Sequence, residues 1–176
     1  MASFQEDSGI SLRTYRPEDI PHIISRHGAL YADEHGWDPK VMESLVDSTC
    51  VDFINTYDPS HGRLWIAERH QNDAVKFVGC VMLFNDREDL AQKSAMVRLL
   101  LVEPEERGRR VGTRLVRQAV QFAREEAGYR RVLLWMPGET AAARRIYQRE
   151  GFEKVAEMEH DVFGKKAKAE SWGLNF

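Results

Sequence analysis

The feature that most constrains this chain is the passage from an apolar segment into a basic helix start within residues 97–120, VRLLLVEPEERGRRVGTRLVRQAV. The apolar run is typical of a strand, which Pro104 ends, and an amphipathic helix follows. Arg107, Arg109 and Arg110 lie at the junction. A helix N-terminus already presents unpaired N–H groups and the positive end of the helix dipole. Added arginines indicate a phosphate or pyrophosphate site.

The charge of the chain is distributed unevenly. Residues 107–131 contain eight arginines and two glutamates, a local charge of +6, whereas all 176 residues together have a net charge of -3. A basic segment in an acidic protein fits a local anion site and argues against nucleic-acid binding. The length fits about one domain, and a charged fraction of 30% is ordinary for a soluble globular protein.

Three features of the sequence predict a cytoplasmic protein: its cysteines, its N-terminus and its hydropathy. Cys50 and Cys80 lie in apolar surroundings, which favours two buried reduced thiols, with one disulfide as the alternative. No spacing among Cys, His and carboxylates is typical of a metal site. Residues 1–9 lack the basic and apolar segments of a signal peptide, and no apolar run approaches the ~18 residues of a membrane span. We expect a short tail at 1–9 and one domain at 10–176, binding no metal and no membrane.

Hydrophobic periodicity predicts a mixed α/β domain without repeats or linkers. Strand-like runs occupy residues 10–16, 63–70, 74–85, 93–104 and 131–137, and two final strands flank a turn at Phe163 and Gly164. Helical segments cover about 17–34, the stretch after Asp38-Pro39, 109–127 and 139–150. The order is one strand, two helices, three strands, a helix, a strand, a helix and two strands.

Two of these segments also predict a pattern of burial. The second helix is expected to place an apolar set roughly on one face: Val41, Leu45, Cys50, Phe53 and Ile54. The run RVLLWMP at 131–137 is nearly continuous in apolar residues, which indicates a strand buried on both faces.

The element order and two motifs resemble the GNAT superfamily, whose members transfer an acetyl group from acetyl-coenzyme A. The family signature R/Q-x-x-G-x-G/A is similar to Arg107–Gly112, and the family spacing N-x-x-A-x-x-x-Y is similar to Thr140, Ala143 and Tyr147. The resemblance implies a single GNAT-like α/β domain. Its mixed central sheet would have about seven strands with four helices, split between strands 4 and 5.

The resemblance also implies where the coenzyme binds. The loop would hold the pyrophosphate through Arg107, Gly108, Arg109, Arg110, Val111, Gly112 and Thr113. The fourth strand would pair with the pantetheine arm at Leu100, Leu101 and Val102, and Thr140, Ala143 and Tyr147 would complete the site. Arg110 stands where the family has glycine, and we expect it to adopt the conformation of a helical first turn.

Within the superfamily, the chain resembles the acetyltransferase half of bacterial proteins that join a MarR-type DNA-binding domain to a GNAT domain. The similarity lies in SRHGALYADEHGW at 25–37, VRLLLVEP at 97–104 and AARRIYQREGF at 142–152. Because this chain starts with the GNAT domain, the resemblance implies a free-standing catalytic version without a DNA-binding role.

Acetyl transfer to an amine needs a polarised thioester, a neutral amine and a proton for the leaving thiolate. By resemblance, a backbone N–H near Leu101 polarises the carbonyl and Tyr147 is the general acid. No carboxylate precedes Glu103 on the fourth strand, and Glu103 itself fits a turn. Glu34 and His35 are the leading candidates for the base. The alternatives are His27, Tyr31, Asp33, His160 or a chain of water molecules.

The acceptor is expected on the side covered by residues 17–57. Its contacts would be Tyr31, Glu34, His35 and Trp37, with Trp135 at the end of the fifth strand. The leading hypothesis is transfer to a small-molecule amine, such as an amino acid or a xenobiotic. The alternatives are acetylation of protein lysines or N-termini, and a non-catalytic acyl-CoA-binding module. The protein is expected to be a monomer or a homodimer.

Overall fold

A computed structural model describes residues 9–86, 93–138, 140–162 and 165–176, and their side chains except those of 160–162 and 165–167. The strands are β1 (Ile10–Thr14), β2 (Arg63–Gln71), β3 (Ala74–Asn85), β4 (Ser94–Val102), β5 (Arg131–Pro137), β6 (Glu153–Val162) and β7 (Lys165–Asn175). The helices are α1 (Asp19–His35), α2 (Pro39–Asn55), α3 (Val111–Gln121) and α4 (Ala141–Arg149). A 3₁₀ turn at Pro104–Glu106 precedes α3, and a π-helical turn at Phe122–Glu126 extends it.

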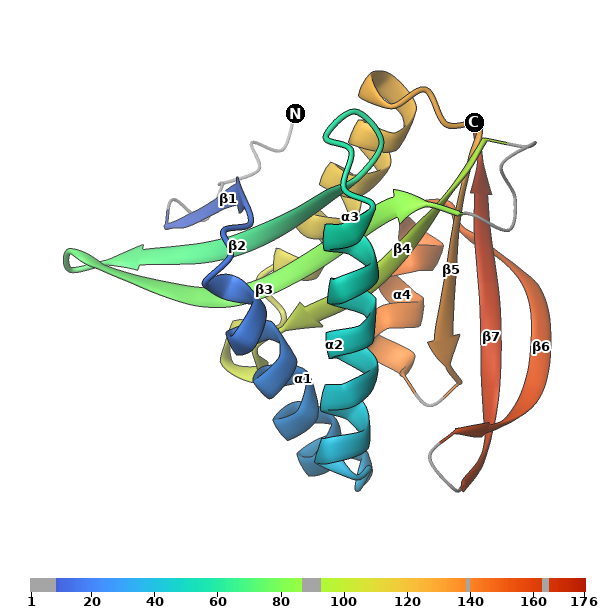
Figure 1. The fold of residues 1–176 in the computed structure, drawn as a ribbon, viewed down its shortest axis with the longest axis horizontal. Coiled ribbons are helices and arrows are strands. Elements are labelled where there is room, and N and C mark those ends of the chain that lie inside the picture. The colour runs from blue at the N-terminus through green and yellow to red at the C-terminus, as the bar shows by residue number, and fades with distance from the viewer. Residues whose placement is uncertain (1–8, 87–92, 139, 163–164) are drawn as a thin grey trace.

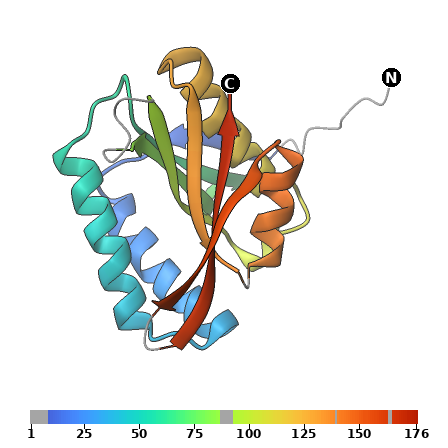
Figure 2. The same cartoon turned by 90° about the vertical axis from the view of Figure 1, so that its right-hand side faces the viewer.

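The strands form one twisted sheet in the order β1-β2-β3-β4-β5-β7-β6. Only β4 and β5 pair in parallel, and the other neighbouring strands are antiparallel. Helices α1 and α2 cover one face of the sheet, and α3 and α4 cover the other (Figures 1 and 2). Each face has its own apolar core, one built around Phe53 and Ile66 and the other around Leu115 and Phe122. This architecture confirms the predicted single α/β domain with seven strands and four helices.

The junction between α1 and α2 follows from the residues that end and begin a helix. Gly36 ends α1 in a left-handed conformation with a φ of 66°, and its N–H donates to the carbonyls of the last turn. Asp38 then caps α2, because its carboxylate accepts from the N–H of Lys40 at 2.8 Å. Pro39 occupies the first turn, where no N–H is needed. The two helices therefore start and stop where the sequence predicts.

The predicted apolar face of α2 was partly wrong. Cys50 and Phe53 are buried as expected, together with Met42 and Val46. Val41, Leu45 and Ile54 are instead more than 40% exposed. Apolar residues spaced about four apart can lie along either of two adjacent stripes of a helix, so the spacing alone does not show which stripe is buried. Here the stripe with the larger side chains, Met42 and Phe53, packs on the sheet.

The prediction that β5 is buried on both faces was also wrong. Burial alternates along the strand: Val132, Leu134 and Met136 are buried, whereas Leu133 and Trp135 are half-buried. The buried set belongs to the apolar core under α3 and α4. Leu133 and Trp135 line a cavity, to which Leu134 and Met136 also contribute. Cys50 and Cys80 are buried free thiols, as predicted. Among the described residues, no helix is long and apolar enough to span a bilayer.

Candidate active site

The sheet divides between its two parallel strands. β4 and β5 pair from Ser94 opposite Arg131 to Val97 opposite Leu134. At that point β4 contains a bulge, because Cys80 lies opposite Leu101 while Met82 lies opposite Arg98. Leu99, inside the bulge, has a φ of 53°, a conformation rare for a side chain of this size. The bulge changes the direction of the rest of β4, so β4 and β5 diverge beyond it. This is the predicted split between strands 4 and 5.

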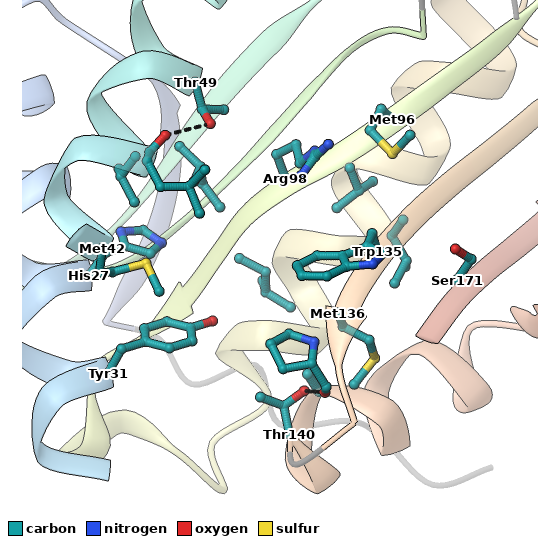
Figure 3. A pocket seen from close by; sticks show the side chains of 18 of the residues that line it. His27, Tyr31, Met42, Thr49, Met96, Arg98, Trp135, Met136, Thr140 and Ser171 are labelled. Carbon is teal, nitrogen blue, oxygen red and sulfur yellow. Dashed lines mark hydrogen bonds between the residues drawn. The ribbon is translucent and has the colours of Figure 1, made fainter. Parts of the chain in front are cut away.

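A cavity of about 610 Å³ opens at this split, large enough for a small organic ligand. Its walls come from α1, α2, β4, β5 and α4, and Tyr31 and Trp135 face it from opposite sides (Figure 3). The lining is largely apolar. Among the described residues that line it, Arg98 carries the one formal charge at neutral pH, and none carries a carboxylate. Arg98 was not predicted as a site residue, although alternation along β4 places it on the same face as Met96.

The loop before α3 turns into the helix through two left-handed residues, Gly108 with a φ of 78° and Arg110 with a φ of 63°. The prediction that Arg110 adopts a helical first turn was therefore wrong: it takes the conformation that glycine adopts most easily. Arg110 is the N-cap residue of α3, and an arginine side chain cannot accept the helix's first N–H groups. Those groups of Val111, Gly112 and Thr113 thus form the positive end of α3.

Arg107 joins the loop to the other face of the sheet. Its Nε donates to the carbonyl oxygen of Val102 at 3.2 Å, and its Nη2 lies 2.7 Å from Oε1 of Glu34. Arg109 lies farther from an anion, with Nη1 3.8 Å from the Glu106 carboxylate. The arginine cluster thus holds the loop in place and keeps positive charge beside the start of α3.

Gly112 has a steric role that the sequence did not indicate. A Cβ at this position would lie 2.7 Å from Cδ1 of Ile146 and 3.3 Å from Cγ2 of Val102. Glycine therefore allows the first turn of α3 to pack directly against α4 and β4. At Gly108 a Cβ would meet nothing within 4 Å, so glycine there serves the backbone conformation alone.

Tyr147 lies on α4 and lines the cavity together with Thr140 and Ala143. Its side chain is buried, and its ring packs edge-on against Phe152 with centroids 5.4 Å apart. Burial raises the pKa of the Tyr147 phenol above its ordinary value. The Thr140 hydroxyl donates to the carbonyl of Pro137 at 2.7 Å, which fixes the turn leading into α4. Tyr147 is thus a fixed, protonated phenol at the cavity wall.

The residues predicted for the acceptor separate into two groups. Tyr31, Trp37 and Trp135 line the cavity, as does Leu100 among the predicted coenzyme contacts. Glu34 and His35 are not among the lining residues. Glu34 is held by Arg107, and the His35 ring lies 5.5 Å from the rings of Tyr31 and Trp37.

The remaining candidates for the base lie in different surroundings. Asp33 is exposed, and the side chain of His160 lies outside the described residues. Glu103 is the N-cap residue of the 3₁₀ turn before α3, in agreement with its expected place in a turn. Its carboxylate forms a bidentate pair with Arg26 at 2.7 and 2.6 Å. His27 is buried and lines the cavity, and burial lowers its pKa to about 4.

Comparison with known proteins agrees with this geometry. Residues 29–152 match the acetyltransferase (GNAT) family. N-acetyltransferase family 8 member 3 of Rattus norvegicus is 32% identical over 127 residues, which cover 71% of this chain and 53% of that protein. The chain therefore spans about half the length of the curated relative it matches.

Solved structures share the fold at low sequence identity. A putative phosphinothricin N-acetyltransferase superimposes with a TM-score of 0.71 at 16% identity, covering 94% of this chain and 98% of the other. A putative acetyltransferase from Salmonella typhimurium, solved with its cofactor acetyl-CoA, gives 0.70 at 14% identity and covers 95% and 94%. A spermidine N-acetyltransferase from Vibrio cholerae, solved with CoA and spermine, gives 0.69 at 16% identity and covers 96% of each chain. By its sequence match and its split sheet, this chain belongs to the GNAT family of acetyltransferases.

Proposed function

We propose that the chain is an acetyl-CoA-dependent N-acetyltransferase that acetylates the primary amine of a small molecule. The observation that carries this proposal is the continuous cavity at the β4/β5 split, which has Tyr147 on one wall and the α1/α2 layer on the other. Such a space admits a thioester from one side and an amine from the other. Its volume of about 610 Å³ suits a compact acceptor.

The residues of the split fit the coenzyme. The positive end of α3 and the arginines around it suit a pyrophosphate, which Arg107–Thr113 would hold through N–H groups and charge. The edge of β4 beyond its last pair with β5 offers backbone at Leu100, Leu101 and Val102 for the amides of the pantetheine arm. Thr140 and Ala143 would line the path to Tyr147. Bound acetyl-CoA supplies an acetyl group activated as a thioester.

Groups of this chain would carry out each remaining step of the acetyl transfer. A backbone N–H in the bulged part of β4, near Leu101, polarises the acetyl carbonyl. The amine nitrogen bonds to the acetyl carbon as the carbon–sulfur bond breaks. The Tyr147 hydroxyl donates its proton to the departing sulfur, and the amine's surplus proton leaves toward solvent, from which Tyr147 is reprotonated. Protons and charge balance in this scheme.

The roles of Glu34 and His35 in the acceptor site remain predictions. They follow Tyr31 by three and four residues, about one helical turn, and Glu34 joins the coenzyme loop to α1 through Arg107. These positions support an influence on the edge of the site. Four further points also remain predictions: the kinship with the MarR-fusion subgroup, the cytoplasmic location, the absence of nucleic-acid and membrane partners, and the monomeric or homodimeric state.

A screen for CoA release tests the proposed function. The protein would be incubated with acetyl-CoA and a panel of small primary amines, lysine-containing peptides and peptides with free N-termini, and the free thiol would be measured. We expect release with small amines and little with peptides. Release with peptides alone would favour protein acetylation. Tight acetyl-CoA binding without release for any acceptor would show a non-catalytic binding module and contradict the proposal.

A further inference from the structure

The charge and polarity of the side chains that line the cavity determine which kind of amine can bind there. Its described lining side chains include one cation, Arg98, and no carboxylate. An ammonium group moved from water into such surroundings loses its hydration without gaining an ion pair, which is strongly unfavourable. A molecule with two or more ammonium groups meets this cost at each of them. A neutral amine on an apolar body would instead be buried against groups such as Trp135, Met42 and Leu133.

A buried neutral amine still needs a hydrogen-bond acceptor, and His27 offers one. Its Nδ1 lies 2.8 Å from the carbonyl oxygen of Ile23. Because a carbonyl can only accept, Nδ1 carries the proton, and Nε2 of the neutral ring carries a lone pair. Nε2 is buried and has no hydrogen-bond partner in the described structure, although the ring lines the cavity (Figure 3). An unsatisfied buried polar atom at a cavity wall points to a ligand group that completes it.

We propose that the acceptor is a primary monoamine with an apolar body, bound as the neutral amine, and that its N–H donates to Nε2 of His27. This inference rests on the proposed acetyl transfer. His27 is then a substrate-binding residue that holds the amine. The described wall, with Arg98 and no carboxylate, selects the unprotonated form, which is the nucleophile the reaction needs. The amine lone pair remains directed at the acetyl carbon while one N–H is held.

The proposal predicts a specific pH dependence of acceptor binding. Among the residues that the structure describes, the titratable and charged side chains lining the cavity are His27 and Tyr31 from α1, Arg98 from β4 and Tyr147 from α4. Burial keeps His27 neutral above pH 5 and keeps both phenols protonated, and arginine stays charged. The described wall therefore does not titrate between pH 6.5 and 8.5. An alkylammonium loses its proton near pH 10, so the neutral fraction rises about tenfold per pH unit in this range.

Calorimetry on the CoA-saturated protein tests this dependence with 2-phenylethylamine and spermidine as probes. We expect 2-phenylethylamine to bind at least tenfold more tightly than spermidine. We also expect its apparent Kd to fall about tenfold per unit between pH 6.5 and 8.5. Binding of 2-phenylethylamine that does not change with pH, the absence of its binding, or equal or tighter binding of spermidine would overturn the proposal.

Two variants test the role of His27. His27→Phe keeps an aromatic ring but removes Nε2, so we expect the Kd of 2-phenylethylamine to rise about five- to tenfold, with the acetyl-CoA Kd unchanged. His27→Gln places an amide oxygen that can accept, and should restore part of the affinity. His22→Phe is the matched control, because His22 lies on the same helix, is exposed and does not line the cavity.

A spectroscopic measurement on the unaltered protein avoids any question of folding. In protein labelled with ¹⁵N-histidine, 2-phenylethylamine should shift the Nε2 resonance of His27 and leave the other histidines unaffected, with His27→Gln assigning the signal. An unshifted Nε2 resonance at saturating amine would contradict the proposal. If CoA is released with some amine but these tests fail, the acceptor assignment alone is wrong. If no amine or peptide releases CoA, the proposed function fails instead.

Discussion

Replacing Tyr147 by phenylalanine should lower kcat by roughly tenfold or more, since a general acid typically contributes about 10²–10⁴-fold, while the acetyl-CoA affinity changes little. The substitution removes one hydroxyl from a buried ring and keeps the edge-on contact with Phe152. Burial raises the pKa of the phenol, so the wild-type acid keeps its proton to a higher pH than an exposed tyrosine. Loss of the Tyr147 proton should therefore not lower the rate between pH 8 and 10. Steady-state kinetics over this range measure both effects.

Tyr129→Phe is the matched control for this change. Tyr129 is also buried, but its hydroxyl donates to the carbonyl of His61 at 2.7 Å, and it does not line the cavity. Its loss should reduce stability by about 1 kcal/mol without changing kcat. If Tyr147→Phe turns over at the wild-type rate, Tyr147 packs against Phe152 and does not protonate the leaving thiolate.

Replacing Gly112 by valine should weaken acetyl-CoA binding about a hundredfold. The first turn of α3 would lose its close approach to the pyrophosphate, and each charge-assisted hydrogen bond contributes about 1.5–3 kcal/mol. The same valine would collide with Cδ1 of Ile146, which lies 2.7 Å from the position of a Cβ. We therefore also expect a loss of stability of about 1–3 kcal/mol from overpacking. Calorimetric titration and thermal unfolding separate the two effects.

The double variant Gly112→Val/Ile146→Ala distinguishes the two roles of Gly112. Shortening Ile146 opens the space that the valine needs, so stability should recover in part while the affinity remains low. Ile146→Ala alone should bind acetyl-CoA as the wild type does, since its contact is with α3 and not with the proposed phosphate position. Recovery of affinity in the double variant would show that Gly112 acts through the packing of α3 on α4 only.

Much of the fold could be predicted because the signals are local. Gly36 ends α1 and Asp38 caps the start of α2. Asn72 and Asp73 adopt positive φ in the turn between β2 and β3. The errors concern tertiary packing. An apolar run such as RVLLWMP does not reveal that one of its faces borders a cavity, because the same residues suit a buried wall and a ligand-binding wall.

The candidate site was only partly predictable for similar reasons. Motif spacing indicated the loop and Tyr147, but Arg110 was misjudged because a left-handed arginine is rare and depends on the fold around it. Glu34 had the right chemistry for an ammonium, yet its carboxylate pairs with Arg107 across the sheet edge. Arg98 precedes the β4 bulge and shares its face with Met96 by simple alternation, so this position could have been read from the strand pattern. The unsatisfied Nε2 of His27 depends on packing between α1 and the sheet. That packing has no signature in sequence spacing.

The most direct test of the central claim is to locate acetyl-CoA on the protein by hydrogen exchange of backbone amides, measured by NMR with and without the coenzyme. We expect slower exchange at residues 99–102 in the bulged part of β4 and at 107–113 before and within α3, with the amides of β1 and β2 unchanged. These are the segments on either side of the split. Saturable binding that leaves both segments unprotected, or that protects β1 and β2 instead, would contradict the assignment of the split as the coenzyme site.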